Sequence, residues 1–183
     1  MRKAATAITN MIARGVVAMV NAGSKMQGLQ LRLTAGEIKG GVEHFEPYGY
    51  TSHPLPGAEA LVVFVGGDRS HGVAIVVGDR KFRLQGLKPG EVALYSDEGD
   101  TLIFKRGREV ELATRSFVVN ATEQILLNAP VVRASEALSV GGKLEAEAGA
   151  SVAGLLENNG VDVGSEHDHD ENDNGGPTGS PRR

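Results

Sequence analysis

The 183-residue sequence contains no cysteine and no tryptophan, and its aromatic residues are limited to five phenylalanines and three tyrosines. Without cysteine the fold has neither disulfide bonds nor thiolate metal ligands. Because large aromatic side chains are scarce, we expect a core built from Val, Leu, Ile and Ala. Small aliphatic side chains of this kind suit narrow, layered packing.

Long apolar runs are also missing. Runs such as residues 61–65 and 73–77 are far shorter than the roughly 20 residues of a membrane-spanning helix. The start Met1-Arg2-Lys3 is like that of a signal peptide, but polar residues between positions 6 and 14 interrupt the apolar run that would have to follow. We therefore predict a soluble chain without a signal peptide.

Neither charge nor motif points to nucleic acid or to catalysis. The formal net charge is −4 at pH 7, whereas binding to a phosphate backbone needs clustered Lys and Arg. The sequence has no Gly-x-Ser-x-Gly motif, no His-Glu-x-x-His motif and no Walker loop. We therefore predict a protein that is not an enzyme, has no catalytic residues and binds no specific nucleic acid.

The first 85 residues divide into an arm and a barrel. Residues 1–14 form the arm, in which apolar residues at helical spacing predict a short amphipathic helix over residues 4–12. In residues 15–85, five apolar segments separated by Gly, Pro and Asn predict the strands of an OB-fold-like barrel. Interleaved aromatic and basic residues, which hold single strands in binding OB-folds, are lacking, so we favour a structural barrel. Three histidines of this region have no acidic or nucleophilic residue at a spacing that would indicate a catalytic site. We expect them to be surface or hydrogen-bonded residues: His44, His53 and His71.

Residues 86–142 show a ladder of very short strands, in which apolar and polar residues alternate and the later segments recur about every seven residues. A lone ladder of this kind would expose its apolar side and its edges. Three interwound copies solve this problem, because their inward Val, Leu, Ile and Phe side chains can fill a shared axis. The pattern alone also fits a monomeric sandwich, but the low aromatic content favours the thin axis of a trimeric β-helix.

The last segment, residues 143–183, contains His167 and His169. Residues two apart in a strand point to the same face, so the two imidazoles can act together. If three chains met on a threefold axis, six imidazoles would surround one transition-metal ion, a number that argues against a tetrahedral structural zinc site. A solvated acidic tail with two histidines fits the sequence as well. The fold of residues 143–156, which are rich in Ala and Glu but interrupted by Gly, stays open.

Three features in this order resemble the central spike proteins of Mu-type phage baseplates, the membrane-piercing needles of contractile tails. They are the barrel segment at residues 15–83, the ladder that runs through residues 138–142, and Asn159-Gly160-Val161 followed by His167-x-His169. The resemblance implies an all-β homotrimer with an N-terminal OB-fold barrel, an intertwined triple-stranded β-helix shaft and a pointed tip. At that tip, His167 and His169 of each chain would bind one iron ion, and calcium or chloride ions can occupy the axis of such needles.

The same resemblance implies a place in the virus particle. The chain would be assembled in the host cytoplasm into the phage tail baseplate, where its barrel would contact tail hub proteins. Sheath contraction would then drive the needle transiently through the host outer membrane to deliver DNA. The alternative that the sequence leaves open is a trimeric OB-fold module that binds oligosaccharide or single-stranded nucleic acid.

Overall fold

The computed structural model describes residues 11–33, 36–164 and 167 of the chain. The chain divides into two units, residues 1–120 and 121–183, which are considered separately. The regular structure of the described residues consists of strands and short 3₁₀ turns, which confirms the predicted all-β class. Within these residues, no helix is long and apolar enough to cross a membrane.

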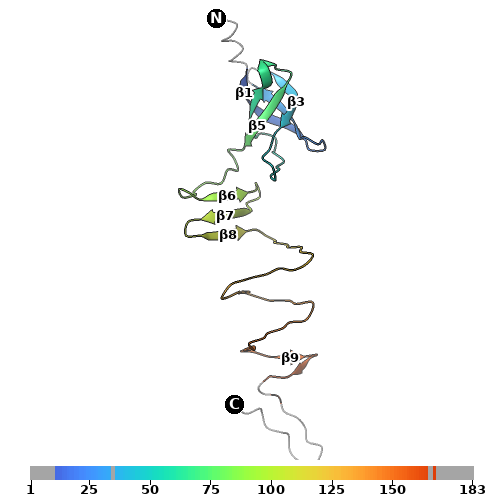
Figure 1. The fold of residues 1–183 in the computed structure, drawn as a ribbon, viewed down its shortest axis with the longest axis vertical. Coiled ribbons are helices and arrows are strands. Elements are labelled where there is room, and N and C mark those ends of the chain that lie inside the picture. The colour runs from blue at the N-terminus through green and yellow to red at the C-terminus, as the bar shows by residue number, and fades with distance from the viewer. Residues whose placement is uncertain (1–10, 34–35, 165–166, 168–183) are drawn as a thin grey trace, which may run out of the picture. The chain divides into compact units, whose positions relative to one another are not determined.

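A closed five-stranded barrel occupies the N-terminal part of the first unit (Figure 1). Its strands follow the spatial order β1-β2-β3-β5-β4, in which β3 and β5 form the parallel pair and the other pairs are antiparallel. This arrangement confirms the predicted OB-like barrel. The strand bounds are β1 (Ile12–Asn21), β2 (Gly28–Leu33), β3 (Ile38–His44), β4 (Glu59–Phe64) and β5 (Gly72–Gly78).

The barrel begins three residues before its predicted boundary, because β1 starts at Ile12 and pairs there with Val63 of β4. The backbone oxygen of Met11 also accepts a hydrogen bond from Phe64 N at 2.8 Å. Of the helix predicted over residues 4–12, all but these last two residues lie outside the described residues.

The barrel core is aliphatic, as the composition predicts. Alternate strand residues point inward, and Phe64 is the aromatic side chain among them. The Arg69 guanidinium lies 4.6 Å from the Phe64 ring centroid and pairs with Glu37, so a cation covers this ring. The buried core residues are Val17, Leu29, Leu31, Leu33, Val42, Ala58, Ala60, Val62, Phe64 and Ala74.

A three-stranded antiparallel sheet follows the barrel in the same unit, with strands β6 (Val92–Tyr95), β7 (Thr101–Lys105) and β8 (Glu109–Ala113). The strands lie where the alternating pattern predicts them. They pair with one another within this chain through tight turns, one of which is closed by Ser96 and Asp100. This part of the ladder is therefore a local meander.

From Thr114 to Leu155 the described chain has no strand. One backbone–backbone hydrogen bond joins described residues of this stretch, from Gly149 N to Ala146 O at 3.5 Å. No helix is present at residues 143–156, which settles the question that the sequence left open. The predicted triple-stranded β-helix needs two further chains and stays a prediction.

The second unit ends its described part with a β-hairpin, formed by β9 (Glu157–Asn158) and β10 (Val161–Asp162). Its two loop residues both have positive φ, 51° at Asn159 and 77° at Gly160. Asn-Gly is the residue pair that a type I′ hairpin turn favours.

Candidate functional site

The β6–β8 sheet presents one face that is almost entirely apolar. Cross-strand pairing aligns Val92, Phe104 and Val110 in one row, and Leu94, Leu102 and Leu112 in the next. Five of these six side chains are exposed in the single chain, with exposed fractions from 44% at Leu112 to 64% at Val92. Apolar faces of this kind mark contact surfaces.

The opposite face of the same sheet is mixed, with Lys105, Glu109 and Glu111 beside uncharged residues such as Tyr95 and Ile103. Lys105 Nζ lies 3.7 Å from Glu109 Oε1 and also pairs with Glu111. The sheet therefore has one face suited to water and one face suited to burial against other apolar groups.

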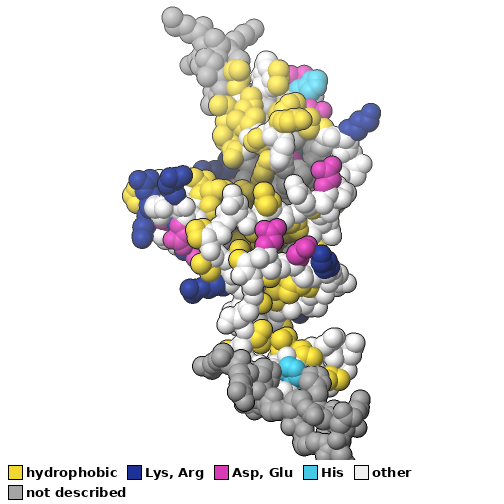
Figure 2. Space-filling model, turned by 60° about the horizontal axis from the view of Figure 1, so that its bottom comes forward, with side chains coloured by type: hydrophobic (Ala, Val, Ile, Leu, Met, Phe, Trp, Pro, Cys, Tyr) yellow, Lys and Arg dark blue, Asp and Glu magenta, His cyan; other side chains and the backbone are white. Residues whose placement is uncertain are grey.

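Apolar exposure continues along the residues after β8, and Figure 2 shows hydrophobic side chains at the surface of the chain. Every described residue from Arg106 to Val163 is exposed. Between Thr114 and Leu155, exposed large hydrophobic residues occur on a backbone that is almost unpaired within the described chain. The exposed large hydrophobic residues between positions 117 and 156 are Phe117, Val118, Val119, Ile125, Leu126, Leu127, Val131, Val132, Leu138, Val140, Leu144, Val152, Leu155 and Leu156.

Of the two predicted metal ligands, His167 is described and His169 lies outside the described residues. The carbonyl oxygen of Gly164 accepts hydrogen bonds from His167 N, at 3.4 Å, and from the ring nitrogen Nδ1. A carbonyl oxygen only accepts, so Nδ1 is the donor of this hydrogen bond. Metal-binding histidines commonly have this arrangement. The described residues hold no cluster of three possible metal ligands, so the iron site stays a prediction.

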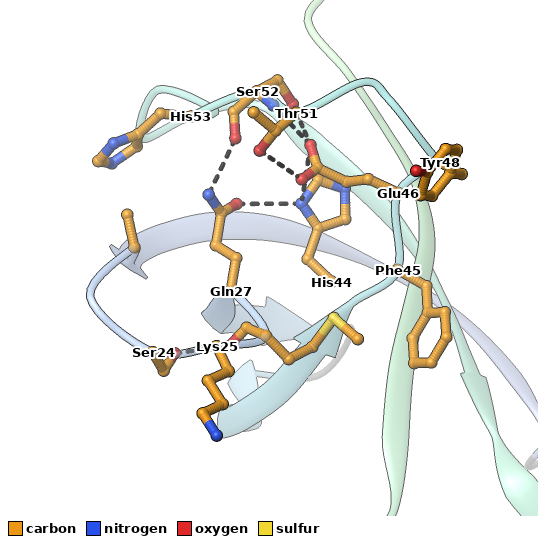
Figure 3. Close-up of a pocket in the computed structure, with 12 residues that line it drawn as sticks. Ser24, Lys25, Gln27, His44, Phe45, Glu46, Tyr48, Thr51, Ser52 and His53 are labelled. Atoms are coloured by element: carbon orange, nitrogen blue, oxygen red, sulfur yellow. Dashed lines mark hydrogen bonds and ion pairs between the residues drawn. The ribbon is translucent and has the colours of Figure 1, made fainter.

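A separate hollow of about 530 Å³ lies on the barrel, between the β1–β2 connection and the β3–β4 connection (Figure 3). His44 is 4% exposed there, and its Nδ1 lies 3.0 Å from Gln27 Oε1. Gln27 Nε2 donates to the carbonyl oxygen of Ser52 at 2.9 Å, so Gln27 Oε1 is an acceptor and His44 Nδ1 is the donor. The three residues join two loops that are distant in the sequence.

Glu46 stabilises the same loop through hydrogen bonds to other residues of that loop. Its carboxylate accepts hydrogen bonds from Ser52 N at 2.6 Å, Ser52 Oγ at 2.8 Å and Thr51 Oγ1 at 2.8 Å. Burial by itself would raise the pKa of Glu46, but these hydrogen bonds and the nearby His44 together lower it. Ser52 Oγ donates to Glu46 rather than to His44, so the geometry does not form a nucleophile–histidine pair. The network holds the loop in place.

The prediction that His44 is a hydrogen-bonded histidine is confirmed, whereas its partners Gln27 and Glu46 were missed. Gln27 is 17 residues away, and only the folded barrel brings the two side chains together. The loop that this network orders also exposes three of the few aromatic side chains of the chain: Phe45, Tyr48 and Tyr50. Exposed aromatic side chains on an ordered loop are typical of protein contact surfaces.

Comparison with known proteins gives consistent matches. Residues 14–81, essentially the barrel, match the family described as "Bacteriophage Mu Gp45, N-terminal". The chain is 38% identical over 120 residues to "Baseplate puncturing device gp45" of Escherichia phage Mu, a match that covers 66% of this chain and 61% of that protein. It is 35% identical over 167 residues to "Mu-like prophage FluMu protein gp45" of Haemophilus influenzae, covering 88% of this chain and 87% of that protein. The match to the phage Mu protein thus spans less than two thirds of that relative.

Proposed function

The chain belongs to the phage Mu gp45 family, the family that its motifs indicated, and we propose that it is the trimeric central spike of a contractile phage tail. As a member of this family it is a structural component of the virion tail baseplate. The spike would pierce the host outer membrane when the sheath contracts. No bond has to be broken for this, which agrees with a non-enzymatic role.

The observation that carries the trimer is the unpaired backbone and exposed apolar surface between Thr114 and Leu155. Backbone N–H and C=O groups beside apolar side chains need hydrogen-bond partners once the surface is buried. Strands of two further chains supply both the hydrogen-bond partners and the apolar contacts. The apolar face of β6–β8 extends the same interface.

At the tip, His167 and His169 of three chains would hold one iron ion. Imidazole nitrogens suit iron, and the hydrogen bond from His167 Nδ1 to Gly164 O fits a ligand that binds through Nε2. Bound iron would supply crosslinks between chains, which the chain cannot make through cysteine. The ordered aromatic loop at Phe45, Tyr48 and Tyr50 is the part of the barrel that we propose for contact with tail hub proteins.

Mass and metal measurements on the purified full chain test the proposal. We expect about three times the 19.2 kDa chain mass by light scattering and one iron ion per three chains by elemental analysis. Replacing both His167 and His169 by Ala should remove the iron and leave the mass unchanged. A monomer would contradict the shaft, and a metal-free trimer would contradict the tip. After tail contraction on host cells, immunolabelling should locate the spike on the inner side of the outer membrane.

A further inference from the structure

The two turns of the β6–β8 sheet carry opposite charges. The acidic turn, residues 96–100, connects β6 to β7 and has three carboxylates. The basic turn, residues 106–108, connects β7 to β8 and has two guanidinium groups on either side of a glycine. Because β7 has five residues, at about 3.4 Å per residue the turns are roughly 17 Å apart, at opposite ends of the sheet (Figure 1). They cannot contact each other within one chain.

A carboxylate at the base of each turn holds the backbone in place. In the acidic turn, Asp100 Oδ1 accepts a hydrogen bond from Thr114 Oγ1 at 2.8 Å. Beside the basic turn, the carboxylate of Glu91 accepts from Lys88 N at 2.9 Å and from Arg106 N at 3.2 Å. These two carboxylates are occupied within their own chain. The other charged side chains therefore project from turns whose backbone is already ordered.

The charged side chains at the tips of the turns are exposed and unpaired. Within the part of the chain that the structure describes, none of them forms an ion pair or a side-chain hydrogen bond, whereas the adjacent Lys105 pairs with two glutamates of β8. Two free carboxylates at one end of the sheet thus match two free guanidinium groups at the other end. These four exposed residues are Asp97, Glu98, Arg106 and Arg108.

We propose that the two turns meet between chains, so that the acidic turn of one chain lies against the basic turn of the next. The inference rests on the proposed function, because it needs the trimer. In a cyclic trimer each chain contacts its neighbours through two different surfaces. When the apolar faces of β6–β8 point to the shared axis and the strands run around it, unlike ends of neighbouring sheets lie side by side. Charge complementarity therefore favours a second copy of this chain as the occupant of this face.

The contact between the turns sets the direction of the chains more than the strength of the assembly. Exposed ion pairs contribute little each to affinity, whereas opposite charges across an interface suppress wrong arrangements. A chain inserted in the reverse direction would place two acidic turns side by side at one junction and two basic turns at the other. Both junctions would then be repulsive. The turns would thus select three chains that run in the same direction.

Charge reversal in the full-length chain tests this contact. Glu98→Lys and Arg108→Glu each replace an attraction by a repulsion at all three junctions. We expect each to lower the trimerisation constant, obtained from the molecular mass by light scattering against urea, by about 10- to 1,000-fold. Both substitutions together in one chain should restore most of this loss, because the reversed charges attract again. In about 1 M salt, where the screening length is about 3 Å, the effect of each single substitution should shrink.

Glu43→Lys is the matched control, because it makes the same charge change at an exposed residue of β3 in the barrel. It should leave the trimerisation constant nearly unchanged. If it weakens the trimer as much as Glu98→Lys, net charge alone accounts for the effect and the inference is wrong. The inference is also overturned if the single reversals leave the trimer intact, or if their combination restores nothing. An unmodified chain that is a monomer would contradict the proposed trimer itself, a result distinct from an intact trimer in the variants.

Discussion

Phe104 lies at the centre of the apolar face on β6–β8, and its replacement by Ser tests whether this face is buried between chains. The side chain is 49% exposed in the single chain. A phenylalanine can bury about 200 Å², so roughly 100 Å² remain to be buried by partners. At about 25 cal/mol per Å², this contributes about 2.5 kcal/mol per chain and about 7.5 kcal/mol for three chains. The trimerisation constant should fall by about five orders of magnitude.

Urea titration of the full-length protein measures this change. Light scattering at each urea concentration reports the mass, and two protein concentrations reveal the mass-action dependence of an assembly that unfolds as it dissociates. We expect the urea concentration at the midpoint of dissociation to be well below that of the unmodified chain for Phe104→Ser. This midpoint should rise with protein concentration.

Ile103 supplies the matched control, because it precedes Phe104 on β7 and lies on the opposite face of the sheet, where it pairs with Glu111. Ile103→Ser should therefore leave the trimer nearly unchanged. If Ile103→Ser weakens the trimer more than Phe104→Ser, the chains meet through the other face. If neither variant shifts the midpoint, the sheet does not contribute to the assembly.

Two further predictions concern the barrel. Phe64→Ala should destabilise the barrel by about 3–5 kcal/mol, because the ring is fully buried. Phe45→Ala should change the stability little. If a calorimetric melt shows equal decreases in melting temperature for the two variants, the described core is contradicted. Glu46→Gln should reduce stability at neutral pH, because the lowered pKa of Glu46 makes its ionised form stabilising above the ordinary value of 4.5. That stabilisation is lost as pH falls through the lower folded-state pKa, so the difference in melting temperature between the two proteins should shrink towards pH 3, and a constant difference would refute the assignment.

The barrel could be predicted because its information is local. Alternation of apolar residues and the Gly, Pro and Asn punctuation between them mark the strands, and five short strands close into few architectures. The hydrogen-bond network of His44 could not be predicted in this way. Its partner Gln27 is on another loop, and polar residues at such separations carry no periodic signal.

The ladder of short strands at residues 86–142 shows a different limit of prediction from the sequence. The alternation at Val92 and Leu94, Leu102 and Phe104, and Val110 and Leu112 predicts short strands. The chain forms them, at residues 92–95, 101–105 and 109–113, because tight turns allow neighbouring segments to pair. From Thr114 to Leu155 the same alternation continues, but the described chain has no strand there. In the proposed trimer, the alternation would specify which side chains face inward, and the strands that pair with this stretch would come from the other two chains.

In the proposed trimer, a long alternating segment does not by itself fix the register between the three chains, but the structures at its two ends can. A slip of two residues between chains keeps apolar side chains inward, so alternation alone specifies register poorly. The β6–β8 sheet precedes the segment and folds within one chain, which gives each strand a fixed starting point. His167 and His169 follow it in the sequence, so the proposed shared metal site would form only when all three chains are in step. The proposed metal would then act as a check on register as well as a crosslink, which is a physical reason to expect its ligands at the end of the proposed shaft rather than along it.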